Sequence, residues 1–202
     1  MSCKRFRAIK PEIRVLGIDD GAFTPHVEGL ATVVGVVFRG GYWLDGVIST
    51  KVEVDGLDAT DKIVSMITAS PHYKQLRVIL LNGVTCAGFN VVDMKKLYEE
   101  TGLPVIAVTR EIPNFKDIRK ALKNLPCSEK RWKAIRGAGE MFKVSTRNNR
   151  AKTYMQISGI CEEEAREILQ KTSTRSDVPE ALRVAHLIAS GISRDTVSGN
   201  NY

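Results

Sequence analysis

Cysteine is scarce in this 202-residue chain, which has only four, at positions 3, 86, 127 and 161. No two of them have the short spacing of a zinc-ligand pair, and nothing indicates an oxidising compartment in which they would form disulfides. No apolar run approaches the roughly 20 residues that span a bilayer, and the first residues lack the apolar core of a secretion signal. We therefore expect a cytoplasmic protein whose fold needs neither zinc nor disulfides.

The common short motifs of nucleotide-binding and zinc enzymes are also absent. The chain contains no Walker loop, GxGxxG, HExxH or CxxC pair, which excludes the most frequent enzymes of those two classes. Its hydrophobic fraction of 43% and charged fraction of 26% are those of an ordinary globular domain. We expect residues 1–195 to form a single domain and residues 196–202 to form a flexible tail.

Basic residues are concentrated in one stretch of the chain. The whole sequence has 30 Lys and Arg against 23 Asp and Glu, but residues 116–152 alone contain twelve basic and three acidic residues. Three aromatic residues, Trp132, Phe142 and Tyr154, lie within or beside this stretch. Cations and stacking rings together suit a nucleic-acid backbone and unpaired bases, although a charge run is also typical of a solvated face. The predicted nucleic-acid-binding residues here are Lys130, Arg131, Arg136, Arg147 and Arg150.

The apolar pattern predicts an α/β fold of the RNase H-like type. Three apolar runs separated by short links indicate antiparallel strands at residues 13–18, 30–38 and 42–54. Helical spacing then alternates with buried strands, which gives helices at 58–69, 91–101 and 114–125 and strands at 76–81 and 105–108. A further strand at 153–158 and helices at 161–172 and 179–190 follow. Three antiparallel strands followed by αβαβα form the RNase H-like mixed sheet, here with an added C-terminal strand and helices.

Polar residues end two of the predicted strands. Asp19 follows the first strand and Asn82 follows the strand at 76–81, and these two strands should be neighbours. A carboxylate and an amide oxygen at adjacent strand ends suit a divalent cation. The alternative is that both positions are turns, since Asp, Asn and Gly dominate turns. Asp20 is a weaker candidate because alternation along the strand points it to the other face.

Two more groups of polar residues are candidates for the same site. Asp58 and Asp61 lie three residues apart near the start of the first helix, where either could cap the helix or bind a metal. In the last helix Arg183 and His186 share a face, so that both can meet one phosphate or one acidic cluster. A lone helical histidine is more often a packed or surface residue, and this alternative stays open.

The chain resembles endonuclease V, and more closely an endonuclease V-like family of uncharacterised, largely archaeal proteins that includes an enzyme called endonuclease dU. The resemblance runs from Arg14 to about Ser190 and rests on the segments LGIDDG, VILLNGVTCAGFNVVD, LPVIAVTRE, YMQISGICEEEAREIL and PEALRVAHLIASGI. The most specific match is Arg-x-Ala-His, which lies at Arg183, Ala185 and His186. Two features depart from endonuclease V: Asn82 stands where that family has Asp, and its Tyr- and Pro-rich wedge is replaced by Val-Asp-Gly-Leu at 54–57.

The resemblance implies a metal-dependent nuclease that hydrolyses a phosphodiester next to a deaminated base, deoxyuridine or inosine. It implies that Asp19 and either Asp58 or Asp61 hold Mg²⁺, with Mn²⁺ as a substitute and Asn82 as a neutral ligand. Arg183 and His186 would orient the phosphate, and Arg110 would contribute a further cation. The alternatives are a non-catalytic nucleic-acid-binding protein with a degenerate metal site, and an enzyme acting on a small phosphorylated ligand. The absence of a phosphate loop disfavours the last.

Overall fold

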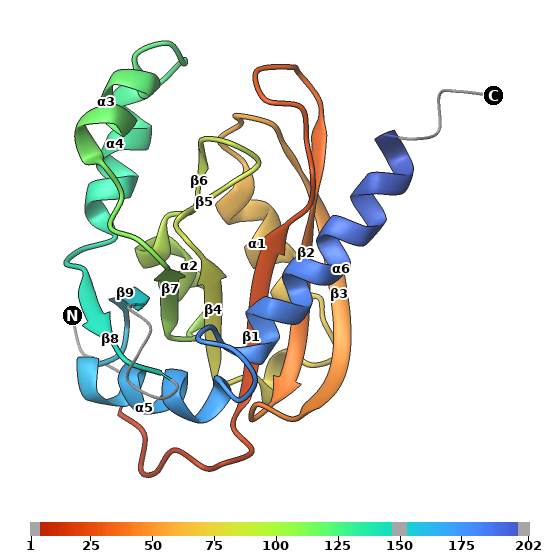
Figure 1. Cartoon of the computed structure of the whole chain (residues 1–202), viewed down its shortest axis with the longest axis vertical. Helices are drawn as coiled ribbons and strands as arrows, with labels where there is room; N and C mark the ends of the chain where they lie inside the picture. Colours follow the sequence, from red (N-terminus) through yellow and green to blue (C-terminus); the bar gives the residue numbers. More distant parts are fainter. Residues whose placement is uncertain (1–4, 147–152, 198–202) are drawn as a thin grey trace.

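A mixed sheet of seven strands occupies the centre of the structure, a computed structural model that describes residues 5–146 and 153–197, with side chains up to residue 193 (Figure 1). Strand β1 (Arg14–Asp20) pairs antiparallel with β2 (Leu30–Arg39) and parallel with β4 (Val78–Asn82). The full order is β3 (Trp43–Glu53), β2, β1, β4, β7 (Val105–Thr109), β9 (Thr153–Ser158) and β8 (Phe142–Val144). This order confirms the predicted RNase H-like arrangement, with β9 as the added strand, antiparallel to β7.

Two layers of helices cover the sheet. Helices α1 (Ala59–Thr68) and α2 (Met94–Thr101) pack on one face, and α5 (Glu162–Thr172) and α6 (Glu180–Val197) pack on the other. Because both faces are covered, β4 and β7 are buried at every position except the last. Side chains of β1 alternate between the layers, with Ile18 in the α1 layer and Val15 in the α6 layer. Asp19 therefore faces α6, and Asp20 faces the α1 layer.

The carboxyl ends of the parallel strands β1, β4 and β7 lie at the same end of the sheet. The short strands that follow β4 and the helices that follow β7 lie at this end (Figure 1). Here a short hairpin of β5 (Thr85–Cys86) and β6 (Asn90–Val91) follows β4. Helices α3 (Phe115–Leu122) and α4 (Ser128–Gly137) form a pair that projects past the sheet. A single 3₁₀ turn, η1 (Tyr73–Gln75), precedes β4. No helix within the described residues is long and apolar enough to cross a membrane.

The structure differs from the sequence prediction in several places, and the short strands β5 and β8 were not predicted. Helix α4 was not predicted, because its sequence is strongly polar and its two buried positions are taken by Ile135 and by an arginine, Arg131. The start of the helix expected at 91–101 is instead β6, and α2 begins only after the N-cap residue Asp93. Helix α6 continues to Val197, so residues 196 and 197 are helical and do not belong to a tail; Arg147, Arg150 and residues 198–202 lie outside the described residues.

Candidate active site

Asp19 lies at the carboxyl end of β1 and is almost completely buried, with 5% of its surface exposed. Its Oδ2 atom is 2.9 Å from Nδ1 of His186 on α6, and its Oδ1 atom accepts a hydrogen bond of 3.0 Å from the backbone N–H of Asp20. The side chain of Asn82, at the end of β4, lies beside the Asp19 carboxylate and lowers its pKa. The structure thus brings together three of the predicted site residues, from positions 19, 82 and 186.

Gly17 in β1 and Gly21 just after it allow α6 to cross the strand closely enough for this contact. A Cβ atom on Gly17 would lie 2.4 Å from the carbonyl carbon of Ala181, and one on Gly21 would lie 2.6 Å from the carbonyl oxygen of Ala189. The helix meets the glycines with a row of buried alanines at four-residue spacing: Ala181, Ala185 and Ala189. Sequence analysis missed this packing, although both glycines flank the aspartates and the alanine spacing is visible in the sequence. The close approach brings the histidine of α6 within reach of the β1 carboxylate.

A surface pocket with a volume of about 380 Å³ opens beside Asn82 and His186. Two arginines line it, namely Arg110 just after β7 and Arg183 on α6, above apolar side chains that include Val108, Val178 and Leu182. Arg183 and His186 therefore share a face of α6, as their spacing predicted. A pocket with two guanidinium groups and an imidazole at a strand end can bind a phosphate.

Arg183 is held in position by Glu180, a residue that sequence analysis did not single out. The Nε and Nη2 groups of Arg183 donate to Oε2 of Glu180 over 2.9 and 2.7 Å. Glu180 is 2% exposed and also accepts a hydrogen bond from the backbone N–H of Arg175. The signal for this pair was the i, i+3 spacing of opposite charges on one helix. The pairing leaves the Arg183 side chain partly exposed at the pocket while restricting its motion.

The strand end carries two adjacent carboxylates, those of Asp19 and Asp20. Burial raises the pKa of Asp19 above its usual value, against the opposing effects of Asn82, Asp20 and His186. Burial also raises the pKa of Asp20, whose Oδ2 atom accepts a hydrogen bond of 2.9 Å from the backbone N–H of Ala87 in the β5–β6 hairpin. Asp20 thus points away from His186, as the strand alternation predicted.

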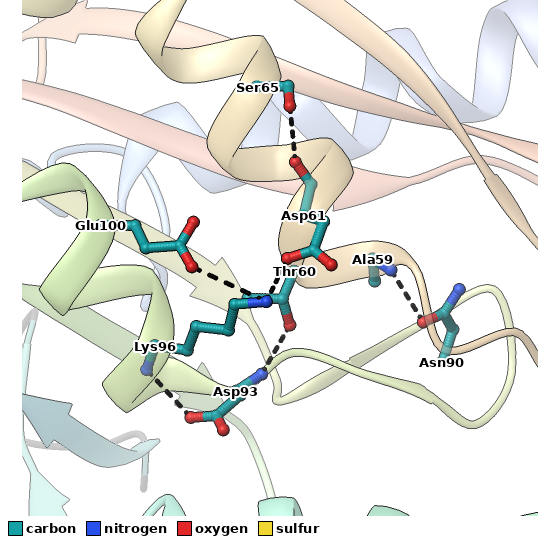
Figure 2. Close-up of polar contacts among 8 residues, drawn as sticks. All are labelled: Ala59, Thr60, Asp61, Ser65, Asn90, Asp93, Lys96 and Glu100. Carbon is teal, nitrogen blue, oxygen red and sulfur yellow. Dashed lines mark hydrogen bonds and ion pairs between the residues drawn. The ribbon is translucent and has the colours of Figure 1, made fainter.

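Asp58 and Asp61, the predicted sources of a second metal-binding carboxylate, are engaged elsewhere. Asp58 Oδ1 accepts hydrogen bonds from Nδ2 of Asn90 and from the backbone N–H of Glu53, which joins the β3–α1 turn to β6. Asp61 forms an ion pair with Lys96 of α2, as Figure 2 shows. Helices α1 and α2 cover the face of the sheet opposite to α6, which Asp19 faces. Figure 2 also shows the backbone N–H of Asp93 donating to Thr60 at the start of α1, which further ties α1 to the segment before α2.

The structure therefore places neither aspartate beside Asp19, where one of them was predicted. Asp19 and His186 already form a pair, so one further carboxylate nearby would complete a group of three potential metal ligands. The described residues contain no group of three or more His, Cys, Asp or Glu side chains placed to hold a metal ion. The sequence spacing could not show this, because Lys96 and Asn90 lie about 30 residues farther along the chain.

Arg131 is also corrected, from a nucleic-acid contact to an internal residue. It is 2% exposed, and its guanidinium donates hydrogen bonds to backbone carbonyl groups of this chain. Its burial lowers the pKa of the guanidinium below its usual value. The sequence alone does not show that Arg131 is buried, because a run of basic residues does not reveal which side chain points into the protein.

The other predicted nucleic-acid-binding residues that the structure describes are exposed: Arg110, Lys130 and Arg136. The aromatic residues of the basic stretch are less accessible than expected. Trp132 packs edge-on against Phe115 with ring centroids 6.4 Å apart, and Phe142 packs against the core beneath α5 and α6. Arg136 lies 5.8 Å above the Phe115 ring. The rings of Phe115 and Trp132 therefore join α3 to α4, and the Phe115 ring lies beneath the exposed Arg136.

The donor set at Asp19 suits a divalent cation only in part. Mg²⁺ prefers oxygen ligands, is commonly held by one or two carboxylates, and completes its coordination with water and substrate phosphates. Asp19 and Asn82 offer a carboxylate and an amide oxygen at adjacent strand ends, and the Asp19 and Asp20 carboxylates, whose pKa values are raised by burial, would gain from added positive charge. These residues therefore fit a Mg²⁺ ion whose coordination is completed by substrate and solvent, and do not form a closed protein cage.

Comparisons with known proteins agree with the resemblance seen in the sequence. A family model described as Endonuclease dU matches residues 11–193. A UPF0215 protein of Methanopyrus kandleri is 50% identical over 196 residues, which cover 97% of this chain and 99% of that protein. The crystal structure of a protein of unknown function from Archaeoglobus fulgidus has a TM-score of 0.80 at 37% identity, and the match covers 89% of this chain and 98% of that one.

Endonuclease V structures share the fold at much lower identity. Endonuclease V of Ciona intestinalis, in complex with a 24mer DNA containing an inosine followed by a ribo-adenosine, has a TM-score of 0.58 at 16% identity. The match covers 92% of this chain and 87% of that one. At this identity the likeness concerns the fold alone. The chain belongs to the endonuclease dU family, and its fold is similar to that of endonuclease V.

Proposed function

We propose that this protein is a metal-dependent endonuclease that hydrolyses a phosphodiester near a deaminated base, deoxyuridine or inosine, in DNA or RNA. The observation that carries the proposal is a buried Asp19 at a strand end, in contact with Asn82 and His186 and next to a pocket lined by two arginines. The membership in the endonuclease dU family supports the reaction and the deaminated base, and the inosine in the Ciona complex supports the wider substrate range.

Mg²⁺, or Mn²⁺ in its place, is the proposed cofactor, with Asp19 and Asn82 as the residues that would hold it. When bound, such an ion would neutralise charge on the phosphate and lower the pKa of a water molecule. Its ligands from the protein would be few, so the phosphate of the substrate would be needed to complete the site. Metal binding should therefore be weak without nucleic acid and stronger with it.

His186 is suited to move a proton. Its Nδ1 atom faces Oδ2 of Asp19, an arrangement that fixes the ring and leaves Nε2 as the atom that can accept a proton from water or donate one to a leaving oxygen. The side chain is 62% exposed and lines the pocket with Arg110 and Arg183. These two guanidinium groups would bind the non-bridging phosphate oxygens and hold the phosphodiester next to the imidazole.

Exposed cations on α4, together with Arg110, would bind the flanking backbone. Lys130, Lys133 and Arg136 are exposed on this helix, which lies in the basic stretch of the sequence. Salt-dependent binding to phosphates would follow from such a surface. Arg147 and Arg150 belong to the same stretch and remain part of the proposal on sequence grounds.

The second candidate function is nucleic-acid binding without cleavage. Two observations favour it: Asn82 stands where endonuclease V has a carboxylate, and no three-ligand group of His, Cys, Asp and Glu lies within the described residues. A degenerate metal site on this fold would keep the basic surface and lose the reaction.

One panel of labelled oligonucleotides distinguishes the two candidates. Substrates containing deoxyuridine, deoxyinosine, riboinosine, a mismatch or no lesion are incubated with Mg²⁺, Mn²⁺ or EDTA, with binding measured in parallel. We expect cleavage near a deaminated base that requires metal and falls sharply in His186→Ala. Tight, salt-sensitive binding without cleavage at any metal concentration would reject the nuclease and support the binding protein.

A further inference from the structure

Arg131 is a buried residue of α4 at which three segments of the chain meet. Its Nη1 group donates to the carbonyl oxygens of Gly56 and Phe89, each over 2.6 Å. Its Nη2 group donates to the carbonyl oxygen of Asp55 over 2.6 Å, and Nε donates to that of Pro126 over 3.0 Å. One side chain thus joins the β3–α1 turn, the β5–β6 hairpin and the start of α4.

This arrangement is unusual for a buried charge, because all four acceptors are neutral carbonyl groups. No salt bridge to Arg131 exists within the described residues, although Asp55 provides a favourable charge at longer range. An apolar side chain of similar volume often stabilises a protein as well as a buried charge does. The planar fork of donors, however, fixes the relative geometry of its acceptors in a way that no apolar side chain can. The role of Arg131 is therefore to fix the positions of these segments relative to one another, and not to add stability.

The segments that Arg131 joins contain strained backbone. Asp55 has φ +52° and Ala87 has φ +46°, a left-handed conformation that non-glycine residues seldom adopt, and Gly88 has φ +86°. The two segments are also bonded to each other, since the N–H of Asp55 donates to the carbonyl of Ala87 and the N–H of Phe89 donates to Oδ1 of Asp55, both over 2.8 Å. Strain of this kind persists only where the surroundings hold it, and it gathers at functional sites.

The β3–α1 turn and the β5–β6 hairpin, joined by Arg131 into one unit, contact the strand end that carries the candidate site. The N–H of Ala87 donates to the carboxylate of Asp20, which follows Asp19 in β1. On its other side the unit adjoins a groove of about 460 Å³ between α4, α2 and α1, whose lining includes Lys130 and Lys133. Arg131 therefore stands between the exposed lysines of α4 and the carboxylates of β1.

We propose that Arg131 is a positioning residue that sets the β5–β6 hairpin and the β3–α1 turn against α4, so that a nucleic acid held by the α4 lysines meets Asp19 in the correct register. The effect on cleavage rests on the proposed function, whereas the effect on the hairpin and the turn does not.

The exchange test compares Arg131→Met and Arg131→Lys with Lys133→Met, a change at an exposed position of the same helix. Lys133→Met is a control for hydrogen exchange only, because Lys133 belongs to the proposed nucleic-acid surface. Hydrogen exchange measured by mass spectrometry should show residues 53–58 and 85–91 exchanging at least about tenfold faster in both Arg131 variants. Exchange in β1 and β4, and in the control, should stay at the wild-type rate. Lysine keeps the charge but lacks the fork, so its failure to restore protection identifies geometry as the cause. If Arg131→Met does not fold, Arg131→Lys carries the same comparison.

A second readout separates positioning from general stability. In the Arg131 variants kcat should fall at least about tenfold while the Kd for the oligonucleotide changes by less than about threefold, because the α4 lysines remain. Wild-type exchange in the hairpin and turn, or faster exchange in every element alike, would overturn the inference. Locally faster exchange in a protein that cleaves no oligonucleotide would support the positioning of the hairpin and the turn by Arg131 and refute the proposed nuclease.

Discussion

Replacing Gly17 with alanine places a methyl group where α6 crosses β1. Its Cβ would lie 2.4 Å from the carbonyl carbon of Ala181 and 2.6 Å from both the carbonyl oxygen of Ala181 and the nitrogen of Leu182. All three are backbone atoms, so the clash cannot be relieved by a side-chain rotation. Ordinary contact begins near 3.4 Å, and the difference between 3.4 and 2.4 Å requires α6 to move by about 1 Å.

We expect this substitution to destabilise the fold by about 2 kcal/mol, within the roughly 1–3 kcal/mol range for an overpacked core. For a chain of this size the melting temperature should fall by roughly 4–8 °C. The same movement of α6 would lengthen the 2.9 Å contact between Asp19 and His186 beyond hydrogen-bonding distance. Loss of stability and loss of the Asp19–His186 pair should therefore appear together.

Gly191→Ala is the matched control, because Gly191 lies on the same helix and, among the described residues beyond its own helical turns, no atom comes within 4 Å of the added methyl group. An alanine in a helix should stabilise it by roughly 0.5–1 kcal/mol relative to glycine. Thermal unfolding followed by circular dichroism gives both values. A Gly17→Ala variant that melts at or above the wild-type temperature would refute the close packing of α6 on β1.

Two further predictions concern single side chains. Burial and neighbouring carboxylates raise the pKa of the Cys86 thiol. Cys86 should therefore react with iodoacetamide at least about tenfold more slowly than the exposed Cys127, which peptide mapping can measure. Equal rates would mean that the β5–β6 hairpin opens readily. Arg110→Ala should weaken oligonucleotide binding and reduce the slope of the logarithm of the binding constant against the logarithm of salt concentration by about 1. Lys51→Ala, on the outer strand β3, should change neither the binding nor the slope. An unchanged slope in Arg110→Ala would show that this residue does not contact the nucleic acid.

The sequence was sufficient to predict the sheet and the two strand ends. Long β-branched runs separated by short turns specify β1 to β3, and polar residues that end apolar strands, such as Asp19 and Asn82, stand out against their surroundings. The resemblance to endonuclease V then supplied His186 as the residue from the last helix. Its contact with Asp19, over 167 positions of the chain, needed the fold.

The features that could not be predicted from the sequence depend on contacts between segments far apart in the chain. Asp61 was a candidate ligand until Lys96 of α2 was placed beside it, and no local pattern links the two. Helix α4 was missed because the inward side of an amphipathic helix is expected to be apolar, whereas here Arg131 occupies it. A buried arginine looks the same in a sequence as an exposed one, and only its carbonyl partners distinguish them.

The most direct test of the account is cleavage by Asp19→Asn compared with Asp61→Asn. Both changes remove one carboxylate charge, and the first keeps the shape of the buried side chain. With the substrate that the wild type cleaves best in Mg²⁺, Asp19→Asn should lose at least about 100-fold in rate while oligonucleotide binding persists, and Asp61→Asn should cleave at nearly the wild-type rate. Full activity in Asp19→Asn, or its loss in Asp61→Asn alone, would contradict the assignment of the active site to the end of β1.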